Sequence, residues 1–198
     1  MRVIAGTRRG ARFEAPAGRG TRPITDRAKE TIFNIVGHRL GRLGDLSDIA
    51  VLDLFAGSGA FGIECLSRGA RSCLFVERDR RALRVLRANL QKLKLVEVAR
   101  TASENAWTMR IPACPGGYGL IFVDPPYRDV AEPFRVLSLL ERLAPRLAED
   151  GLIVFRHAAE TAFDASDAHG VGCVDDRTIG SMRLWLLERS GASAAEDD

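Results

Sequence analysis

The sequence predicts an α/β protein built on a mostly parallel, Rossmann-like sheet with helices on both faces, preceded by a small N-terminal hairpin and helix. From Ile49 onward, short apolar runs alternate with amphipathic stretches of helical period, which is the pattern of stacked β-α units. The run at residues 50–55, Ala-Val-Leu-Asp-Leu-Phe, is apolar at nearly every position, as in strands buried on both faces. The length of 198 residues, 46% of them hydrophobic, suits one globular domain of this class.

The expected strands and helices alternate along this body. Strands are expected at residues 49–54, 72–77, 95–99, 119–123 and 151–156, and helices at 59–68, 79–92, 103–110 and 130–147. A final pair, 171–176 and 182–187, is expected to close the sheet as a hairpin. Ahead of the body, residues 2–5 and 11–15 predict a hairpin, and Thr25 is placed to cap a helix over 26–38.

The charge is unevenly distributed along the chain. Residues 1–45 contain ten Lys or Arg and four Asp or Glu, a balance of +6, whereas the whole chain has 29 basic and 26 acidic residues. A basic arm of this kind is typical of proteins that bind a phosphate backbone, although a solvated arginine-rich surface explains the excess equally well. The candidate nucleic-acid contacts are arginines of this arm: Arg8, Arg9, Arg12, Arg22 and Arg27.

The sequence also argues against a membrane span, a signal peptide and a metal site. No apolar run approaches the roughly 20 residues of a membrane helix, and the first residues lack the apolar core of a signal peptide. We therefore expect a cytoplasmic protein with no membrane partner. We also expect a monomer. The four cysteines are far apart and the three histidines show no ligand spacing, so no metal site is expected. The small, acidic tail, residues 191–198, is expected to be disordered.

A glycine-rich loop follows the first strand of the body. Gly57, Gly59 and Gly62 spell G-x-G-x-x-G at a strand-to-helix turn, where glycines let a ligand approach the backbone. Glu77, at the end of the second strand, is placed to bind ribose hydroxyls. The loop alone fits either a nicotinamide dinucleotide or S-adenosylmethionine.

Asp53 helps to separate these two cofactors. A carboxylate four residues before the first loop glycine suits the ammonium and sulfonium of S-adenosylmethionine better than a pyrophosphate. Each acidic residue also has a simpler interpretation, with Asp53 as a cap of the following turn and Glu77 as a surface carboxylate paired with Arg78 or Arg80.

The fourth strand delivers the motif Asp124-Pro125-Pro126-Tyr127 to the carboxyl edge of the sheet. Two prolines remove two amide donors, so the local polar groups are acceptors, namely the Asp124 carboxylate and backbone carbonyls. If Asp124 and the Pro125 carbonyl accept the N–H groups of an exocyclic amine, the nitrogen lone pair becomes available for methylation, and Tyr127 can stack on the base. The simpler alternative is a rigid turn in which Tyr127 only packs.

Together these motifs resemble the RsmD family of bacterial 16S rRNA guanine-N2 methyltransferases, which have the class I methyltransferase fold. The resemblance extends to about Glu188. It is carried by residues 2–6, by Arg22-Pro23-Ile24-Thr25-Asp26-Arg27 with Glu30 and Phe33-Asn34, and by residues 51–62, 66–70, 75–79 and 124–127. The Asp-Pro-Pro-Tyr motif is also shared with adenine-N6 and other amino methyltransferases, so the N-terminal block distinguishes this family.

The resemblance implies a seven-stranded sheet with a reversed last strand. Residues 46–190 would be the catalytic domain, with the catalytic loop at Asp124, Pro125 and Tyr127, and residues 1–45 would face RNA and help to cover the cofactor. The implied partner is 16S rRNA in a partly assembled 30S subunit. The implied target is one guanine, at a site equivalent to position 966 of 16S rRNA. The implied cofactor is S-adenosylmethionine, bound at Asp53, Gly57, Gly59 and Glu77.

Two positions depart from the family pattern. Where the family has an acidic residue after the third strand to hold the adenine amino group, this chain reads Ala-Arg-Thr-Ala-Ser-Glu at residues 99–104. We expect Thr101 to replace the acidic residue, with Ser103 or a backbone group as alternatives. Arg156 stands after the fifth strand, where a glutamate is expected. Three other functions stay open: adenine-N6 methylation of DNA or RNA, a nicotinamide-dependent oxidoreductase, and an RNA-binding module.

Overall fold

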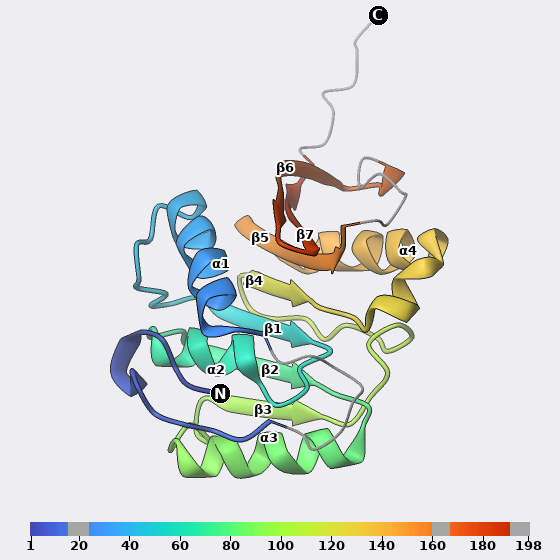
Figure 1. The fold of residues 1–198 in the computed structure, drawn as a ribbon. Coiled ribbons are helices and arrows are strands. Elements are labelled where there is room, and N and C mark those ends of the chain that lie inside the picture. The colour runs from blue at the N-terminus through green and yellow to red at the C-terminus, as the bar shows by residue number, and fades with distance from the viewer. Residues whose placement is uncertain (16–23, 160–166, 191–198) are drawn as a thin grey trace, which may run out of the picture.

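The computed structural model describes residues 1–15, 24–159 and 167–190. Its centre is a seven-stranded sheet with the order β3-β2-β1-β4-β5-β7-β6 (Figure 1). β7 pairs antiparallel with both β5 and β6, and the other neighbouring strands are parallel. The predicted sheet with a reversed last strand is confirmed. The strands are β1 Ala50–Leu54, β2 Ser72–Val76, β3 Ala99–Ala102, β4 Tyr118–Val123, β5 Leu147–Ala158, β6 Val171–Ile179 and β7 Met182–Arg189.

Helices cover both faces of the sheet, as predicted. Within each central strand, alternate residues belong to two separate apolar clusters: Val51 and Leu120 to one, Leu52 and Ile121 to the other. The first cluster includes residues of α1, α2 and α3, and the second includes residues of α4. Alternate side chains point to opposite faces of a strand, so each strand is buried on both sides. The helices are α1 Asp26–Arg39, α2 Ala60–Ser67, α3 Arg80–Lys92 and α4 Pro133–Leu143.

The strand order reverses at β1, which lies between β2 and β4. The carboxyl ends of β1 and β4 are therefore side by side, with Leu54 paired to Val123. The glycine loop that follows β1 and the Asp124–Tyr127 loop that follows β4 leave the sheet at this edge. Open α/β sheets bind their ligands at such a switch point.

The segment that follows β3 differs from the prediction. The helix expected over 103–110 does not form, because the Asn105 side chain accepts the Trp107 N–H in a turn and Pro112 follows closely. Trp107 and Met109 of this segment are buried in the second apolar cluster instead. β3 begins at Ala99, later than expected, since Lys94 adopts a positive φ of 55° in the turn after α3.

The helix expected over 130–147 is also divided. A 3-10 turn, Tyr127–Ala131, precedes α4, and a second one, Ala144–Arg146, follows it. Prolines explain both boundaries, because Pro133 occupies the first turn of α4 and Pro145 cannot continue the helix. By contrast, α1 starts where predicted, with the Thr25 side chain accepting the Ala28 N–H at 3.2 Å.

The predicted N-terminal hairpin is present in reduced form. Arg2 and Arg12 form an isolated antiparallel bridge, with hydrogen bonds from Val3 N to Ala11 O at 3.0 Å and from Phe13 N to Met1 O at 3.0 Å. No regular strand is assigned in this part of the described chain. The polar groups of residues 1–15, called here the N-terminal segment, instead bond to α2 and α3 at several points. Residues 16–23 and the tail 191–198, for which disorder is predicted, lie outside the described residues.

Candidate active site

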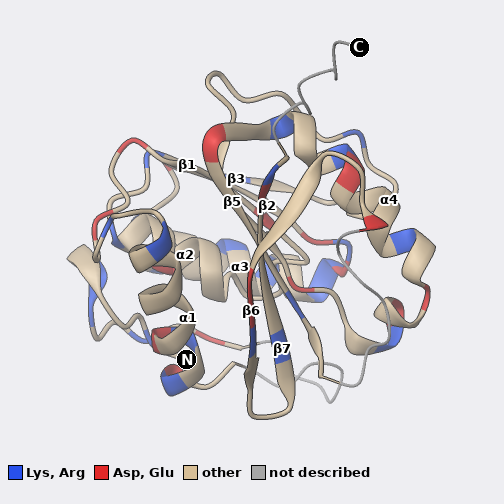
Figure 2. Ribbon diagram, turned by 90° about the horizontal axis from the view of Figure 1, so that it is seen from above, with Lys and Arg blue, Asp and Glu red and all other residues tan. Residues whose placement is uncertain are grey.

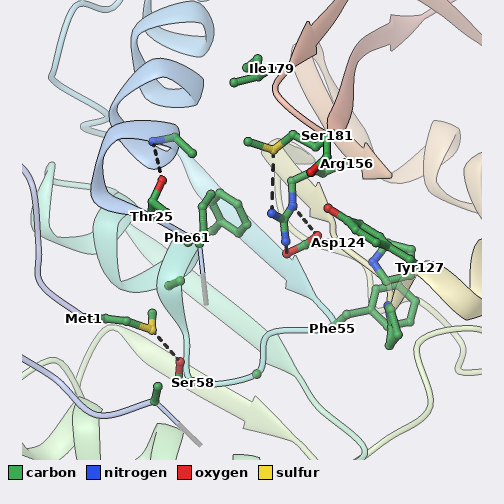
Figure 3. Close-up of a pocket in the computed structure, with 18 of the residues that line it drawn as sticks. Met1, Thr25, Phe55, Ser58, Phe61, Asp124, Tyr127, Arg156, Ile179 and Ser181 are labelled. Carbon is green, nitrogen blue, oxygen red and sulfur yellow. Dashed lines mark hydrogen bonds and ion pairs between the residues drawn. The ribbon is translucent and has the colours of Figure 1, made fainter. Parts of the chain in front are cut away.

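A cavity of about 960 Å³ opens at the switch point of the sheet (Figure 3). One wall is the start of α1 with Thr25 and Arg27, and another is the turn between β6 and β7 with Ser181. The glycine loop and Asp124–Tyr127 lie between these walls. This volume is at the upper end of the roughly 300–1,000 Å³ of ligand pockets. The two motifs singled out in the sequence therefore meet in one large cavity.

The glycines shape the turn into α2. Gly59 is the N-cap of α2 with a φ of 89°, a conformation that side-chain-bearing residues rarely adopt. A Cβ on Gly59 would also approach the Leu86 side chain to 2.6 Å. At Gly62 a Cβ would lie 2.2 Å from the Phe75 ring, so this glycine permits close packing of α2 on β2. A Cβ on Gly57 would meet nothing within 4 Å, which leaves open space next to the loop for a ligand.

Glu77 holds the glycine loop against β2. Its Oε2 accepts the Gly57 N–H at 2.8 Å and its Oε1 accepts the Asp79 N–H at 2.7 Å. Each carboxylate oxygen has two lone pairs, so these bonds leave acceptor capacity for a ligand hydroxyl. Asp79 in turn caps α3 by accepting the Ala82 N–H.

Asp53 lies beneath the glycine loop rather than on the cavity wall. It is only 1% exposed, and its Oδ2 accepts the Gly62 N–H at 2.9 Å. Burial raises the pKa of this carboxyl to about 7; the negative charges of Asp124 and Glu77 act in the same direction, and the bond from Gly62 opposes them. A cation bound nearby would favour the ionised form.

Asp124 and Arg156 form a two-point ion pair inside the cavity (Figure 3). Arg156 Nε donates to Oδ1 and its terminal Nη2 donates to Oδ2, each at 2.7 Å. Burial alone would lower the pKa of Arg156, but the charge and hydrogen bonds of Asp124 outweigh it and raise that pKa. The arginine that departs from the family pattern is therefore the direct partner of the motif aspartate. Pro125 and Tyr127 line the same cavity, and Tyr127 is 46% exposed.

Thr101, expected to replace the missing acidic residue, lies on β3 opposite Phe75. Its hydroxyl accepts a hydrogen bond from Arg87 Nε at 3.1 Å. Thr101 is not among the residues that line the cavity. Its contact with a cofactor stays a prediction.

The candidate RNA-binding arginines lie in different environments. Arg9 and Arg12 are exposed on the N-terminal segment, and Arg27 lines the cavity. Arg8 is half-buried and donates from Nε to Leu93 O at 2.9 Å, which ties it to the end of α3. Arg22 lies outside the described residues. On the far side of the cavity, Figure 2 shows acidic and basic residues together on the β6–β7 hairpin, where arginines pair with aspartates.

Several buried polar residues near the site were not singled out from the sequence. Glu64 is fully buried on α2 and accepts hydrogen bonds from Ile4 N, Ala5 N and the side chains of Lys29 and Arg68. Lys29 lies three and seven residues before Ile32 and Val36, on the apolar face of α1. A lysine on that face was the available signal.

Asn89 on α3 is another buried polar residue. Its side-chain amide donates to Glu14 O at 2.9 Å and to Ser58 O at 3.1 Å, and its oxygen accepts the Glu14 N–H at 2.9 Å. Ser58 belongs to the glycine loop, so Asn89 joins this loop to the N-terminal segment.

The described part of the chain contains neither a candidate metal site nor a candidate membrane span. Residues 1–15, 24–159 and 167–190 contain no group of three or more His, Cys, Asp or Glu arranged to hold a metal ion. Across the same ranges, no helix combines the length and apolar character needed to cross a membrane.

Comparison with known proteins identifies relatives along nearly the whole chain. The family model described as Conserved hypothetical protein 95 matches residues 1–188. Ribosomal RNA small subunit methyltransferase D of Escherichia coli K12 is 40% identical over 200 residues, covering 99% of this chain and 94% of that protein. The protein of the same name from Haemophilus influenzae is 35% identical over 143 residues, covering 71% of this chain and 70% of that protein.

Solved structures agree with these sequence relatives. YhhF from Escherichia coli matches with a TM-score of 0.75 at 32% identity, covering 96% of this chain and 98% of that one. A ribosomal protein L11 methylase from Lactobacillus delbrueckii matches with a TM-score of 0.61 at 18% identity, covering 83% and 80% of the two chains, a likeness of fold alone. The chain therefore belongs to the RsmD family of class I methyltransferases.

Proposed function

We propose that this methyltransferase transfers a methyl group from S-adenosylmethionine to the exocyclic N2 amine of a guanine in 16S rRNA. The observation that carries the proposal is the shared cavity, which Asp124 and Pro125 line together with Gly57 and Ser58 of the glycine loop. Relatives of 40% and 35% identity are named as small-subunit rRNA methyltransferases, which supports the choice of rRNA as substrate.

The residues at the glycine loop fit S-adenosylmethionine. Gly57 borders open space, Glu77 retains acceptor capacity for ribose hydroxyls, and Asp53 places a carboxyl group beneath the loop where a cation is favoured. Gly59 contributes the tight turn, and Thr101 is the proposed contact near the adenine ring. The cofactor supplies an activated methyl group bound to a sulfonium.

The cavity residues then position the amine. The Asp124 carboxylate and the Pro125 carbonyl accept its N–H groups, and they stabilise the positive charge that develops on nitrogen as it bonds to the methyl carbon and the carbon–sulfur bond breaks. The nitrogen afterwards releases one proton to water at the open side of the cavity and so regains neutrality. Tyr127 stacks on the base and fixes its plane, which contributes roughly 1–3 kcal/mol at comparable sites. Because no covalent enzyme intermediate is needed, positioning is the main task of these residues.

The N-terminal part of the chain provides the RNA-binding face in this proposal. Residues 1–45 combine an excess of positive charge with contacts to the cavity, since Met1 and Arg27 line it. Residues 46–190 provide the catalytic domain. We propose a cytoplasmic monomer that acts on a partly assembled 30S subunit. The chain belongs to a family of methyltransferases, so the alternative of a nicotinamide-dependent oxidoreductase is no longer supported.

The direct test measures transfer of a tritiated methyl group from S-adenosylmethionine to a panel of acceptors. The panel contains 30S subunits from a strain that lacks this activity, free 16S rRNA, 50S subunits and double-stranded DNA. Label in 30S subunits or 16S rRNA, absent with Asp124→Ala, supports the proposal. Label in DNA would support the adenine-N6 alternative. No label in any acceptor, with S-adenosylmethionine bound, would contradict it.

A further inference from the structure

Arg156 lies where it can touch the base as well as Asp124. β4 and β5 are parallel, and Val123 is paired with Phe155, so the next residues along the two strands, Asp124 and Arg156, are also neighbours. Their side chains are only 18% and 15% exposed, and both line the cavity. The ion pair is therefore part of the wall that a bound base would meet (Figure 3).

The guanidinium group of Arg156 has N–H donors that its bonds to Asp124 do not use. Arginine carries five N–H groups. The bonds from Nε and Nη2 to Asp124 use two of them, and a long contact from Nη1 to the Met182 sulfur at 3.8 Å uses a third. One N–H on Nη1 and one on Nη2 are left for a further acceptor. These two lie on the same end of the planar group, away from Nε.

Asp124 and Pro125 present acceptors next to this donor. Each Asp124 oxygen accepts one hydrogen bond from Arg156 and keeps a second lone pair. Pro126 has no N–H, and Pro125, whose carbonyl is an acceptor, lines the same cavity. From β5 across β4 into the loop, the order is a donor on Arg156, an acceptor on Asp124 and an acceptor on Pro125.

We propose that Arg156 is a specificity-determining residue that donates a hydrogen bond to O6 of the target guanine. The two Asp124 oxygens then accept N1–H and one N2–H, and the Pro125 carbonyl accepts the other N2–H. This inference rests on the proposed function. The hydrogen-bonding edge of guanine has an acceptor at O6, a donor at N1 and donors at N2, which complements the order found in the cavity. With an adenine amine at Pro125, the N1 acceptor of adenine would face the Asp124 carboxylate, a repulsive contact.

The test compares rRNA substrates with guanosine or 6-thioguanosine at the target position. The thio analogue keeps N1–H and the N2 amine but replaces O6 by sulfur, a weaker acceptor. Single-turnover rates with S-adenosylmethionine are measured for the wild type, Arg156→Met and Arg156→Lys. We expect the wild type to prefer guanosine by roughly ten-fold, the worth of one charged hydrogen bond. Arg156→Met should lose this preference, and Arg156→Lys should keep part of it.

The outcomes separate this inference from the proposed function. If the wild type methylates neither RNA, the proposed function is wrong. Equal wild-type rates on the two RNAs would overturn the inference, whatever the variants do. It is equally overturned if Arg156→Met slows both reactions by the same factor, since Arg156 would then act only by orienting Asp124. Should Arg156→Met fail to fold, the wild type and Arg156→Lys still decide the question.

Discussion

The Lys29 ammonium lies 3.1 Å from the Glu64 carboxylate in a region where both side chains are almost completely buried. Glu64 also accepts the Ile4 and Ala5 N–H groups, and Lys29 Nζ donates to Arg2 O at 2.7 Å. This pair therefore joins α1, α2 and the N-terminal segment at one point. The basic N-terminal segment is an integral part of the fold.

Removing Glu64 should strongly destabilise the protein. Glu64→Ala leaves two cations, Lys29 and Arg68, without their buried partner and two backbone N–H groups without acceptors. We expect the free energy of unfolding to fall by about 3–5 kcal/mol. Urea unfolding followed by circular dichroism measures it. The matched control Arg2→Ala removes an exposed ion pair with Asp26 and should cost less than about 1 kcal/mol. Similar losses in the two variants would disprove the role of the buried pair.

Asn89 should control affinity for the cofactor, because it joins Ser58 of the glycine loop to Glu14. Asn89→Ala is expected to weaken S-adenosylmethionine binding by roughly ten-fold, measured by isothermal titration calorimetry. Glu14→Pro deletes the N–H that Asn89 accepts and should act in the same direction. Glu14→Ala keeps the backbone bonds and serves as the control. Unchanged affinity in Asn89→Ala, with the fold intact, would show that the loop does not depend on this bridge.

Asp53 should make stability depend on pH. Burial raises its pKa to about 7 in the folded protein, whereas its ordinary value is 3.8. Between these values the folded state holds a proton that the unfolded chain has lost, so stability falls as pH rises through this interval. Without cofactor, the wild type should lose stability relative to Asp53→Asn between about pH 5 and about pH 8. Thermal melts of both proteins at the two pH values measure this difference in stability. An equal change in melting temperature for the two proteins would contradict the raised pKa of Asp53.

Arg9 and Arg12 should contribute to RNA binding through charge. Both are exposed, so replacing them by alanine leaves the bonds of the N-terminal segment intact, which truncating the segment would not. The double variant should bind 16S rRNA more weakly and lower the slope of log affinity against log salt by about 1–2. Arg39→Ala is the control, because Arg39 pairs with Glu188 and lies near the opposite edge of the sheet. An unchanged slope in a salt titration would remove these residues from the interface.

Asp124 should be required for the chemical step rather than for cofactor binding. Asp124→Asn keeps the size of the side chain but replaces one acceptor oxygen by a donor. We expect single-turnover methyl transfer to fall by about 10²–10³-fold, as for the loss of one group that stabilises developing charge. Affinity for S-adenosylmethionine should stay within about three-fold. A variant with normal turnover would defeat the proposed role.

The sheet was largely predictable because its signals are local. The alternation of apolar runs and amphipathic stretches is readable in windows of a few residues, and the same windows place the two motifs at the ends of strands. The 103–110 segment was misread as a helix, because the Asn105 turn and the burial of Trp107 and Met109 in the second apolar cluster decided the outcome. Propensity gave way there to local hydrogen bonding and tertiary packing.

The hydrogen bonds and ion pairs between distant residues could not be predicted from such local patterns. Arg156 pairs with Asp124 across 32 residues of sequence, and this depends on β5 lying next to β4. The bonds from Ile4 to Glu64 and from Glu14 to Asn89 span 60 and 75 residues. No periodicity predicts such pairs, although a charged residue on an apolar helix face, as at Lys29, indicates that a buried partner is needed.

The identity of the methylated nucleoside tests the central claim most directly. Small-subunit rRNA treated with the protein and S-adenosylmethionine is digested to nucleosides and analysed by mass spectrometry against standards. The acceptors of Asp124 and Pro125 predict methylation of an exocyclic amine, and the proposed function predicts N2-methylguanosine as the product. A methyl group on adenine N6 would contradict the choice of guanine. A methyl group on a ring carbon or on a ribose hydroxyl would contradict the whole account, because neither position needs the paired acceptors of this cavity.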